Sequence, residues 1–102
     1  MIYYCSITYH VVECIVKKSV FLTGVFANMT YLSLLDLSYN SISEDTFKSG
    51  SLFTPADGQK SLPLLNLNLA YNNIKSIPNT AFDYLDNLDQ VKFPEIFTSI
   101  SN

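Results

Sequence analysis

Few residues in this chain have the types and spacing that catalysis requires. His10 is the only histidine, and no nucleophile elbow, zinc-binding pair or phosphate-binding loop surrounds it. Asp83, Asp86 and Asp89 recur at every third position, which suggests a cation site, but they are more simply interpreted as a solvated face. We therefore expect no enzymatic activity, no metal site and no cofactor, which leaves recognition by a surface as the expected function.

Length and charge narrow the class of protein further. The chain has 102 residues, enough for one small domain with its own core. Its residues are 48% hydrophobic and only 15% charged, a composition too apolar for a disordered tail. Nine acidic residues outnumber six basic ones, all lysines, and the net charge is -3. Without arginine or a basic surface to hold phosphates, nucleic acid is not an expected partner.

Two uncharged stretches have lengths that could suit a leader or a membrane span. Residues 1–12 contain several polar side chains and lack the basic start of a signal peptide. Residues 19–35 are also interrupted by polar side chains, whereas a spanning helix needs about 20 predominantly apolar residues. We expect no membrane span in this chain, and a leader, if the protein is secreted, that is not present in it.

Two segments of the chain superimpose as internal repeats, and repeats of this length organise a whole fold. They are LSLLDLSYNSI at residues 32–42 and LLNLNLAYNNI at residues 64–74, and both follow L-x-x-L-x-L-x-x-N-x-I. A third repeat starts at Leu88, which follows Leu64 by 24 residues, but Ile96 stands where its asparagine should be.

This pattern resembles the leucine-rich repeat family, in the 24-residue form of extracellular receptors and matrix proteins, over roughly residues 12–95. The resemblance implies an α/β solenoid, here a partial one. In it, short parallel strands form a concave sheet and irregular or 3-10 segments form the convex side. We expect parallel, adjacent strands centred on residues 35–37, 67–69 and 91–93. In such a coil the alternate leucines point inward.

Two further residue types have structural roles in this pattern. Asn40 and Asn72 turn the chain out of each strand and satisfy backbone groups, so we interpret them as structural rather than catalytic. Phe26 and Phe82 are expected to form a spine on the convex side.

An insertion separates the two complete repeats. Asn40 and Asn72 are 32 residues apart, eight more than the 24-residue period. The turn-forming Asp57-Gly58 pair predicts an exposed loop around residues 48–61, because lengthening a surface loop costs little free energy. Either Phe47 or Phe53 takes the spine position in this repeat.

The N-terminal segment departs from the repeat. It resembles the cysteine-bearing cap of extracellular leucine-rich repeat proteins, which ends in V-x-C, but only two of the usual four cysteines are present. The resemblance implies a disulfide between Cys5 and Cys14 that covers the first turn, and two buried free thiols are the alternative. The expected organisation is a cap-like segment over residues 1–25, followed by two full repeats and a partial third over residues 26–102.

Asn28-Met29-Thr30 is the chain's only N-x-S/T sequon, so Asn28 is expected to carry a glycan in a secretory compartment. With the cap cysteines, it favours an extracellular or cell-surface glycoprotein. The alternative is an intracellular repeat scaffold, in which Cys5 and Cys14 stay reduced.

Outward residues of successive strands in such a sheet align in rows about 4.8 Å apart. The expected binding residues on the concave face are Leu34, Asp36, Ser38, Tyr39, Asn66, Asn68, Tyr71, Gln90 and Lys92. Tyr39 and Tyr71 follow the strands, as a protein-contact ledge or as cover for the asparagine turns.

The resemblance implies a non-enzymatic protein-binding module of a receptor, adhesion or matrix protein. Its partner would be a protein ligand, a co-receptor or a proteoglycan. The alternative is a structural spacer without a ligand of its own. Because the third repeat is partial, we also expect a fragment of a longer solenoid, or self-association through the open C-terminal edge.

Overall fold

The structure is a computed structural model that describes residues 3–8, 11–16, 26–29, 32–48 and 52–101. For residues 3–8, 11–16 and 48 it describes the backbone. The strands in these ranges are β1 (Tyr3–Thr8), β2 (Val11–Val16), β3 (Leu34–Asp36), β4 (Asn66–Asn68), β5 (Ser76–Pro78), β6 (Gln90–Lys92) and β7 (Ser99–Ser101). The helix described here, α1 (Asp45–Lys48), is a single turn. No helix in the described ranges has the length and hydropathy needed to cross a membrane.

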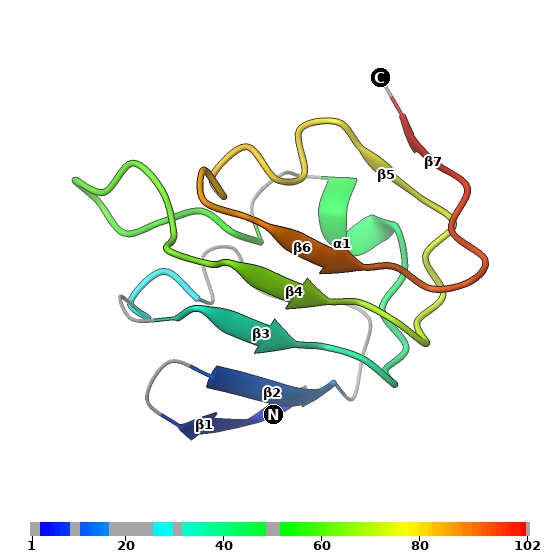
Figure 1. Cartoon of the computed structure of the whole chain (residues 1–102), viewed down its shortest axis with the longest axis horizontal. Coiled ribbons are helices and arrows are strands. Elements are labelled where there is room, and N and C mark those ends of the chain that lie inside the picture. The colour runs from blue at the N-terminus through cyan, green and yellow to red at the C-terminus, as the bar shows by residue number, and fades with distance from the viewer. Residues whose placement is uncertain (1–2, 9–10, 17–25, 30–31, 49–51, 102) are drawn as a thin grey trace.

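Five strands form one sheet in the order β1-β2-β3-β4-β6 (Figure 1). β1 and β2 are an antiparallel hairpin, whereas β2, β3, β4 and β6 run parallel to one another. The last three lie where the repeats predicted strands, one residue earlier than expected, and in the expected order. Their register pairs Leu35 with Leu67 and Leu67 with Val91, so equivalent repeat positions lie side by side.

The leucine positions of the two complete repeats form the core. Leu35, Leu37, Leu67 and Leu69 are all buried, and each contributes roughly 1.5–3 kcal/mol relative to an exposed side chain. On β6 the equivalent residue, Val91, is only partly buried. β6 is the last strand of the five-stranded sheet, so its inward side chain has a packed neighbour on one side only.

A row of phenylalanine rings crosses the repeats on the other side of this core. Phe53 lies between Phe26 and Phe82, with ring centroids 6.4 and 6.3 Å away. The row continues from Phe82 to Phe93 at 6.4 Å and from Phe93 to Phe97 at 3.9 Å. Of the two alternatives left open by the sequence, Phe53 joins the row, while Phe47 is buried elsewhere in the core.

The inserted segment is only partly the exposed loop expected around residues 48–61. Leu52 and Phe53 are buried, because the phenylalanine row draws the start of the insertion into the core. The exposed side chains are at 57–60, on a turn where the Gln59 N–H donates to the Ala56 carbonyl at 3.0 Å. Gly58 sits at the third position of this turn with φ 86°, a left-handed conformation that favours glycine.

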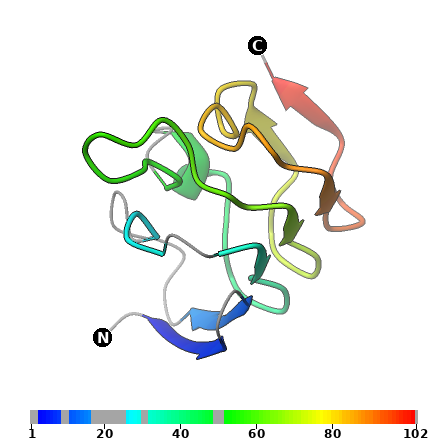
Figure 2. The same cartoon turned by 60° about the vertical axis from the view of Figure 1, so that its left-hand side comes forward.

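A second sheet, not anticipated from the sequence, pairs β5 with β7 in parallel. The Thr98 N–H donates to the Lys75 carbonyl and the Asn79 N–H to the Ser101 carbonyl, both at 2.7 Å. These bonds fasten the C-terminal segment to the second repeat. The β1–β2 hairpin and the β5–β7 pair lie at opposite ends of the molecule (Figure 2).

Candidate protein-binding surface

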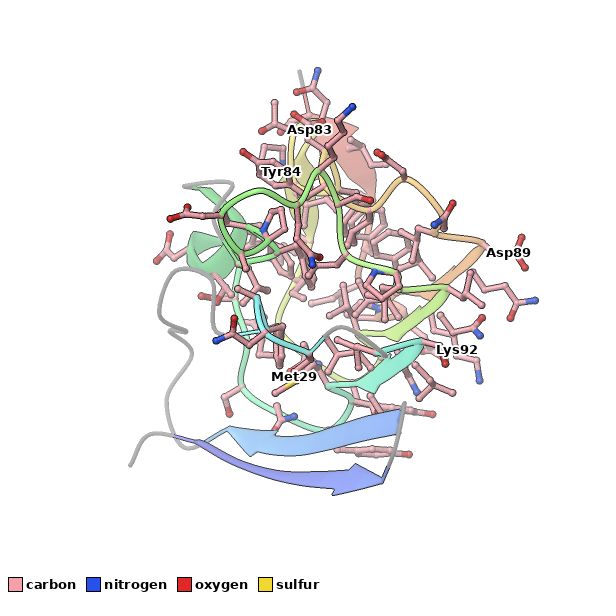
Figure 3. All side chains as sticks on the ribbon, turned by 90° about the vertical axis from the view of Figure 1, so that its left-hand side faces the viewer. Met29, Asp83, Tyr84, Asp89 and Lys92 are labelled. Atoms are coloured by element: carbon pink, nitrogen blue, oxygen red, sulfur yellow. The ribbon has the colours of Figure 1, made fainter. Side chains whose placement is uncertain are left out.

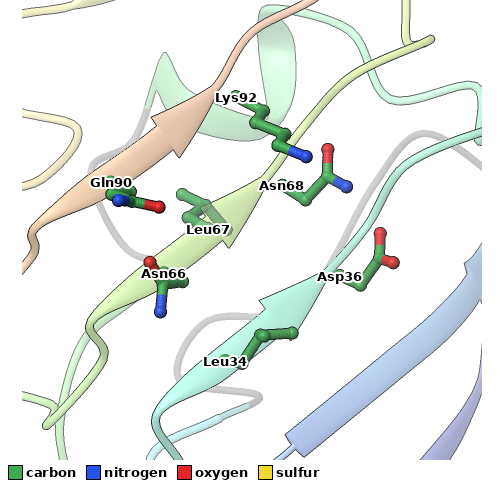
Figure 4. Close-up of a pocket in the computed structure, with 7 residues that line it drawn as sticks. All are labelled: Leu34, Asp36, Asn66, Leu67, Asn68, Gln90 and Lys92. Carbon is green, nitrogen blue, oxygen red and sulfur yellow. The ribbon is translucent and has the colours of Figure 1, made fainter.

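The outward positions of β3, β4 and β6 come together on one surface, which we call the concave face. Its six residues are Leu34, Asp36, Asn66, Asn68, Gln90 and Lys92. The register places them in two rows of three, and with Leu67 they line a hollow of about 300 Å³ (Figure 4). Six of the nine residues predicted for binding are thus gathered at one place.

Two residues of the concave face also close the turns that follow their strands. Asp36 Oδ1 accepts hydrogen bonds from the N–H and the hydroxyl of Ser38, at 2.9 and 2.6 Å. Asn68 Oδ1 accepts from the Ala70 N–H at 3.0 Å. An Asp or Asn side chain that accepts a hydrogen bond from the backbone N–H of the residue two positions later defines an Asx turn. This role was not predicted from the sequence, although Asp and Asn are the residue types that signal it.

Asp36, Asn68 and Lys92 form one row across the three strands. Lys92, its third member, has no acceptor atom with which to close such a turn. The chain leaves β6 differently, through a turn in which the Phe97 N–H donates to the Pro94 carbonyl at 3.0 Å. Across the sheet, the row thus runs from a carboxylate at Asp36 through an amide at Asn68 to an ammonium at Lys92. A charge gradient of this kind fixes the orientation of a partner of complementary charge.

Tyr39 and Tyr71 form a stacked pair just beyond the ends of β3 and β4. Their ring centroids are 4.2 Å apart and the ring planes differ by 10°. Both residues have left-handed backbones, with φ of 57° and 59°, a conformation that is uncommon for bulky side chains. They remain 74% and 62% exposed. The rings therefore cover each other and leave most of their surface open to solvent.

Contact with Tyr71 also changes the pKa of Tyr39. A side-chain hydrogen bond with Tyr71, then Coulombic interaction with it and desolvation, raises the pKa of Tyr39 above its ordinary value of 10.0. This direction favours the neutral phenol of Tyr39, whose ring presents an amphipathic surface. A hollow of about 490 Å³ next to the pair is shared with Asn68 and Lys92, so the tyrosines and the concave face form one continuous surface.

The repeat asparagines hold the turns beside the tyrosines. Asn72 is buried, and its Nδ2 donates to the Leu37 and Leu69 carbonyls at 2.8 and 3.1 Å. Its Oδ1 accepts from the Ile42 N–H at 3.1 Å, so this side chain joins the second repeat to the first. Asn40 is partly buried and donates to the carbonyls of Leu37 and Ser38, at 2.9 and 3.1 Å.

The cysteines and the sequon are the other sites that the sequence predicted. The hairpin register sets Cys5 directly opposite Cys14. Opposite residues of antiparallel strands have Cα atoms about 4.5–5.5 Å apart, within the range of disulfides. Asn28 is exposed, on a turn where the Met29 N–H donates to the Phe26 carbonyl. Thr30 of the sequon and His10 lie outside the described residues.

The aspartates that recur at every third position do not converge. Asp83, Asp86 and Asp89 are all exposed, and Asp83 and Asp89 lie well apart (Figure 3). Among the residues that the structure describes, no group of three or more acidic, histidine or cysteine side chains is arranged to hold a metal ion.

Comparison of the chain with protein-family models, with curated proteins and with solved structures gave no match. Its function must therefore be inferred from its own surface.

Proposed function

We propose that this chain is a segment of a leucine-rich repeat solenoid that binds a partner protein through the concave face. The observation that carries the proposal is the alignment of Asp36, Asn68 and Lys92 on three parallel strands, beside the exposed tyrosine pair. Tyrosine gives a large contact area at low entropic cost and is enriched in protein interfaces. The proposed activity is recognition without catalysis.

The proposed parent is an extracellular or cell-surface receptor, adhesion or matrix protein. The direct pairing of Cys5 with Cys14 and the exposure of Asn28 support passage through a secretory compartment. Material from secretory cells should carry a glycan on Asn28, and Thr30→Ala should lower its mass by that glycan. An unchanged mass would favour the intracellular scaffold.

A structural spacer is the second candidate, and one observation favours it. Asp36 and Asn68 already use one side-chain oxygen each to close the turns after their strands. In a spacer, these residues would serve the fold alone, and the concave face would have no partner.

Two other residues of the concave face separate these candidates, because their side chains make no turn hydrogen bond in the described structure. Asn66→Ala and Gln90→Ala should weaken binding to a secreted or cell-surface partner by at least about tenfold, or roughly 1.4 kcal/mol. Gln59→Ala removes an exposed amide from the inserted loop and is the matched control. If no partner binds, or if all three variants bind alike, the spacer is the better interpretation.

A further inference from the structure

The tyrosine pair lacks a third member in the third repeat. The register that pairs Asn68 with Lys92 continues to Glu95 as the counterpart of Tyr71. Tyr39 covers one face of the Tyr71 ring at 4.2 Å. Because the first and third repeats flank the second on opposite sides, the other face of Tyr71 is directed toward the third repeat. There it borders a hollow of about 270 Å³.

This hollow combines an aromatic face with a carboxylate. Tyr71 and Glu95 line it together with Ala70, Asn72, Phe93, Pro94 and Ile96. Glu95 is exposed and has no ion-pair partner among the described residues. The volume is just below the range of about 300–1,000 Å³ that is typical of small-molecule pockets, so it suits a single long side chain.

We propose that this hollow binds an arginine side chain of a partner protein. The proposal rests on the proposed function only in taking the occupant to be a protein. A guanidinium is planar, so it can stack on the open face of Tyr71 while its N–H groups donate to the Glu95 carboxylate. Its methylene stem would pack against the exposed side chain of Ile96.

Other side chains fit this combination less well. A lysine ammonium is compact and strongly hydrated, and it cannot stack as a plane. A neutral aromatic ring would stack on Tyr71 but would leave the Glu95 carboxylate partly desolvated without a partner.

The composition of the chain indicates where the arginine comes from. All six basic residues of this chain are lysines, so a second copy cannot supply a guanidinium. The net charge of -3 favours association with a basic partner. These two observations favour an arginine of a partner protein as the occupant.

The test is an NMR titration of the full 102-residue chain with N-acetyl-argininamide. The Tyr71 ring resonances should shift saturably. N-acetyl-citrullinamide, which has nearly the same shape but no charge, and N-acetyl-lysinamide should bind at least about threefold more weakly, the scale of one exposed cation–π contact or ion pair.

Variants assign this binding to the hollow. Glu95→Gln should weaken binding of the argininamide about threefold, whereas Asp83→Asn, the same charge change at an exposed site elsewhere, should leave it unchanged. Tyr71→Phe keeps the ring and should keep the binding, and Tyr71→Leu should reduce it. Should Tyr71→Leu fail to fold, the comparison of Glu95→Gln with Asp83→Asn still tests whether the argininamide binds in this hollow.

Three results would overturn the proposal. The first is the absence of saturable shifts, and the second is equal binding of lysinamide and argininamide. The third is that N-acetyl-tyrosinamide binds as tightly as argininamide and that Glu95→Gln does not affect its binding. Any of these would leave the concave-face proposal standing, since that is judged by Asn66→Ala and Gln90→Ala. If Asn66→Ala and Gln90→Ala do not weaken partner binding, the arginine proposal is unaffected, because the argininamide titration tests it separately.

Discussion

The two repeat asparagines, Asn40 and Asn72, differ in how deeply they are buried. Asn72 bonds backbone groups of both repeats from a buried position, whereas Asn40 is only partly buried. Asn72→Ala should therefore lower the free energy of unfolding by about 1–3 kcal/mol, the cost of leaving buried backbone groups unpaired. Chemical denaturation of this variant measures the loss, and Asn40→Ala should cost less. A loss below about 0.5 kcal/mol for Asn72→Ala would contradict this role.

Glu44 makes a second connection between repeats. Its Oε1 accepts a hydrogen bond from the Lys75 N–H at 2.7 Å, and this bond is the main reason that the pKa of Glu44 lies below its ordinary value of 4.5. A carboxyl whose pKa is lowered by folding stabilises the protein above its unfolded pKa. This stabilisation is lost as the pH falls through the folded pKa.

A neutral side chain at position 44 should therefore remove the contribution of Glu44 to the pH dependence of the free energy of unfolding. Relative to Glu44→Gln, the wild-type chain should be more stable at pH 7, and this advantage should disappear as the pH drops below about 4.5. Thermal unfolding of both proteins across this range measures it. Asp57→Asn, an exposed acid on the inserted loop, is the control, and a difference between wild type and Glu44→Gln that is constant with pH would exclude the linkage.

At the scale of the elements, β3 and β4 are only three residues long, yet the pairing of their backbones extends beyond them. The Leu37 N–H donates to the Asn68 carbonyl at 2.9 Å, and the Tyr39 N–H donates to the Ala70 carbonyl at 3.1 Å. The backbones of the first two repeats therefore remain paired up to the left-handed tyrosines. This continuation sets the two rings side by side.

The β1–β2 hairpin carries the prediction of a disulfide. Because Cys5 and Cys14 are direct cross-strand partners, secreted material should contain no free thiol before reduction and two after it. Closing this short loop should stabilise the chain by about 2–3 kcal/mol in the chain-entropy account. Thiol titration and the unfolding of Cys5→Ser/Cys14→Ser measure these two quantities. Two free thiols in native secreted protein would instead support the reduced, intracellular alternative.

At the scale of the whole molecule, the two edges of the five-stranded sheet differ. The hairpin strand β1 forms one edge, and β6, with partly buried Val91, forms the other. Ile96 and Ile100 are 44% and 53% exposed beyond β6. An edge strand beside exposed apolar side chains is a template for pairing with another chain.

We therefore expect the chain to self-associate through its C-terminal edge as its concentration rises. Ile100 lies on β7, an edge strand of the two-stranded sheet, and Ile100→Lys should reduce this association because a charge on an exposed edge opposes pairing. Tyr84→Lys changes an exposed aromatic residue elsewhere and should not reduce it. Sedimentation over a range of concentrations measures the effect. A monomer that unfolds cooperatively at high concentration would contradict this expectation.

The sequence by itself determined the features that follow from repetition. The repeated L-x-x-L-x-L pattern, with Val91 and Phe93 at its last two positions in the third repeat, predicted β3, β4 and β6 in parallel and in order, because equivalent positions of successive turns lie side by side. The same periodicity assigned the outward rows that line the concave face. The Asp57-Gly58 pair predicted the turn at Gly58, since the conformation of a turn depends on its own residues.

Only the tertiary structure decided the features that depend on contacts between distant segments. The choice of Phe53 over Phe47 for the phenylalanine row depends on where Phe26 and Phe82 lie. The pairing of β5 with β7, the stacking of the tyrosines and the hollow beside Glu95 depend in the same way on how successive repeats pack. A periodic pattern assigns each residue to a face, but it does not set the distance between side chains of different turns. The packed chain sets that distance, because burial and hydrogen bonding are satisfied across all repeats at once.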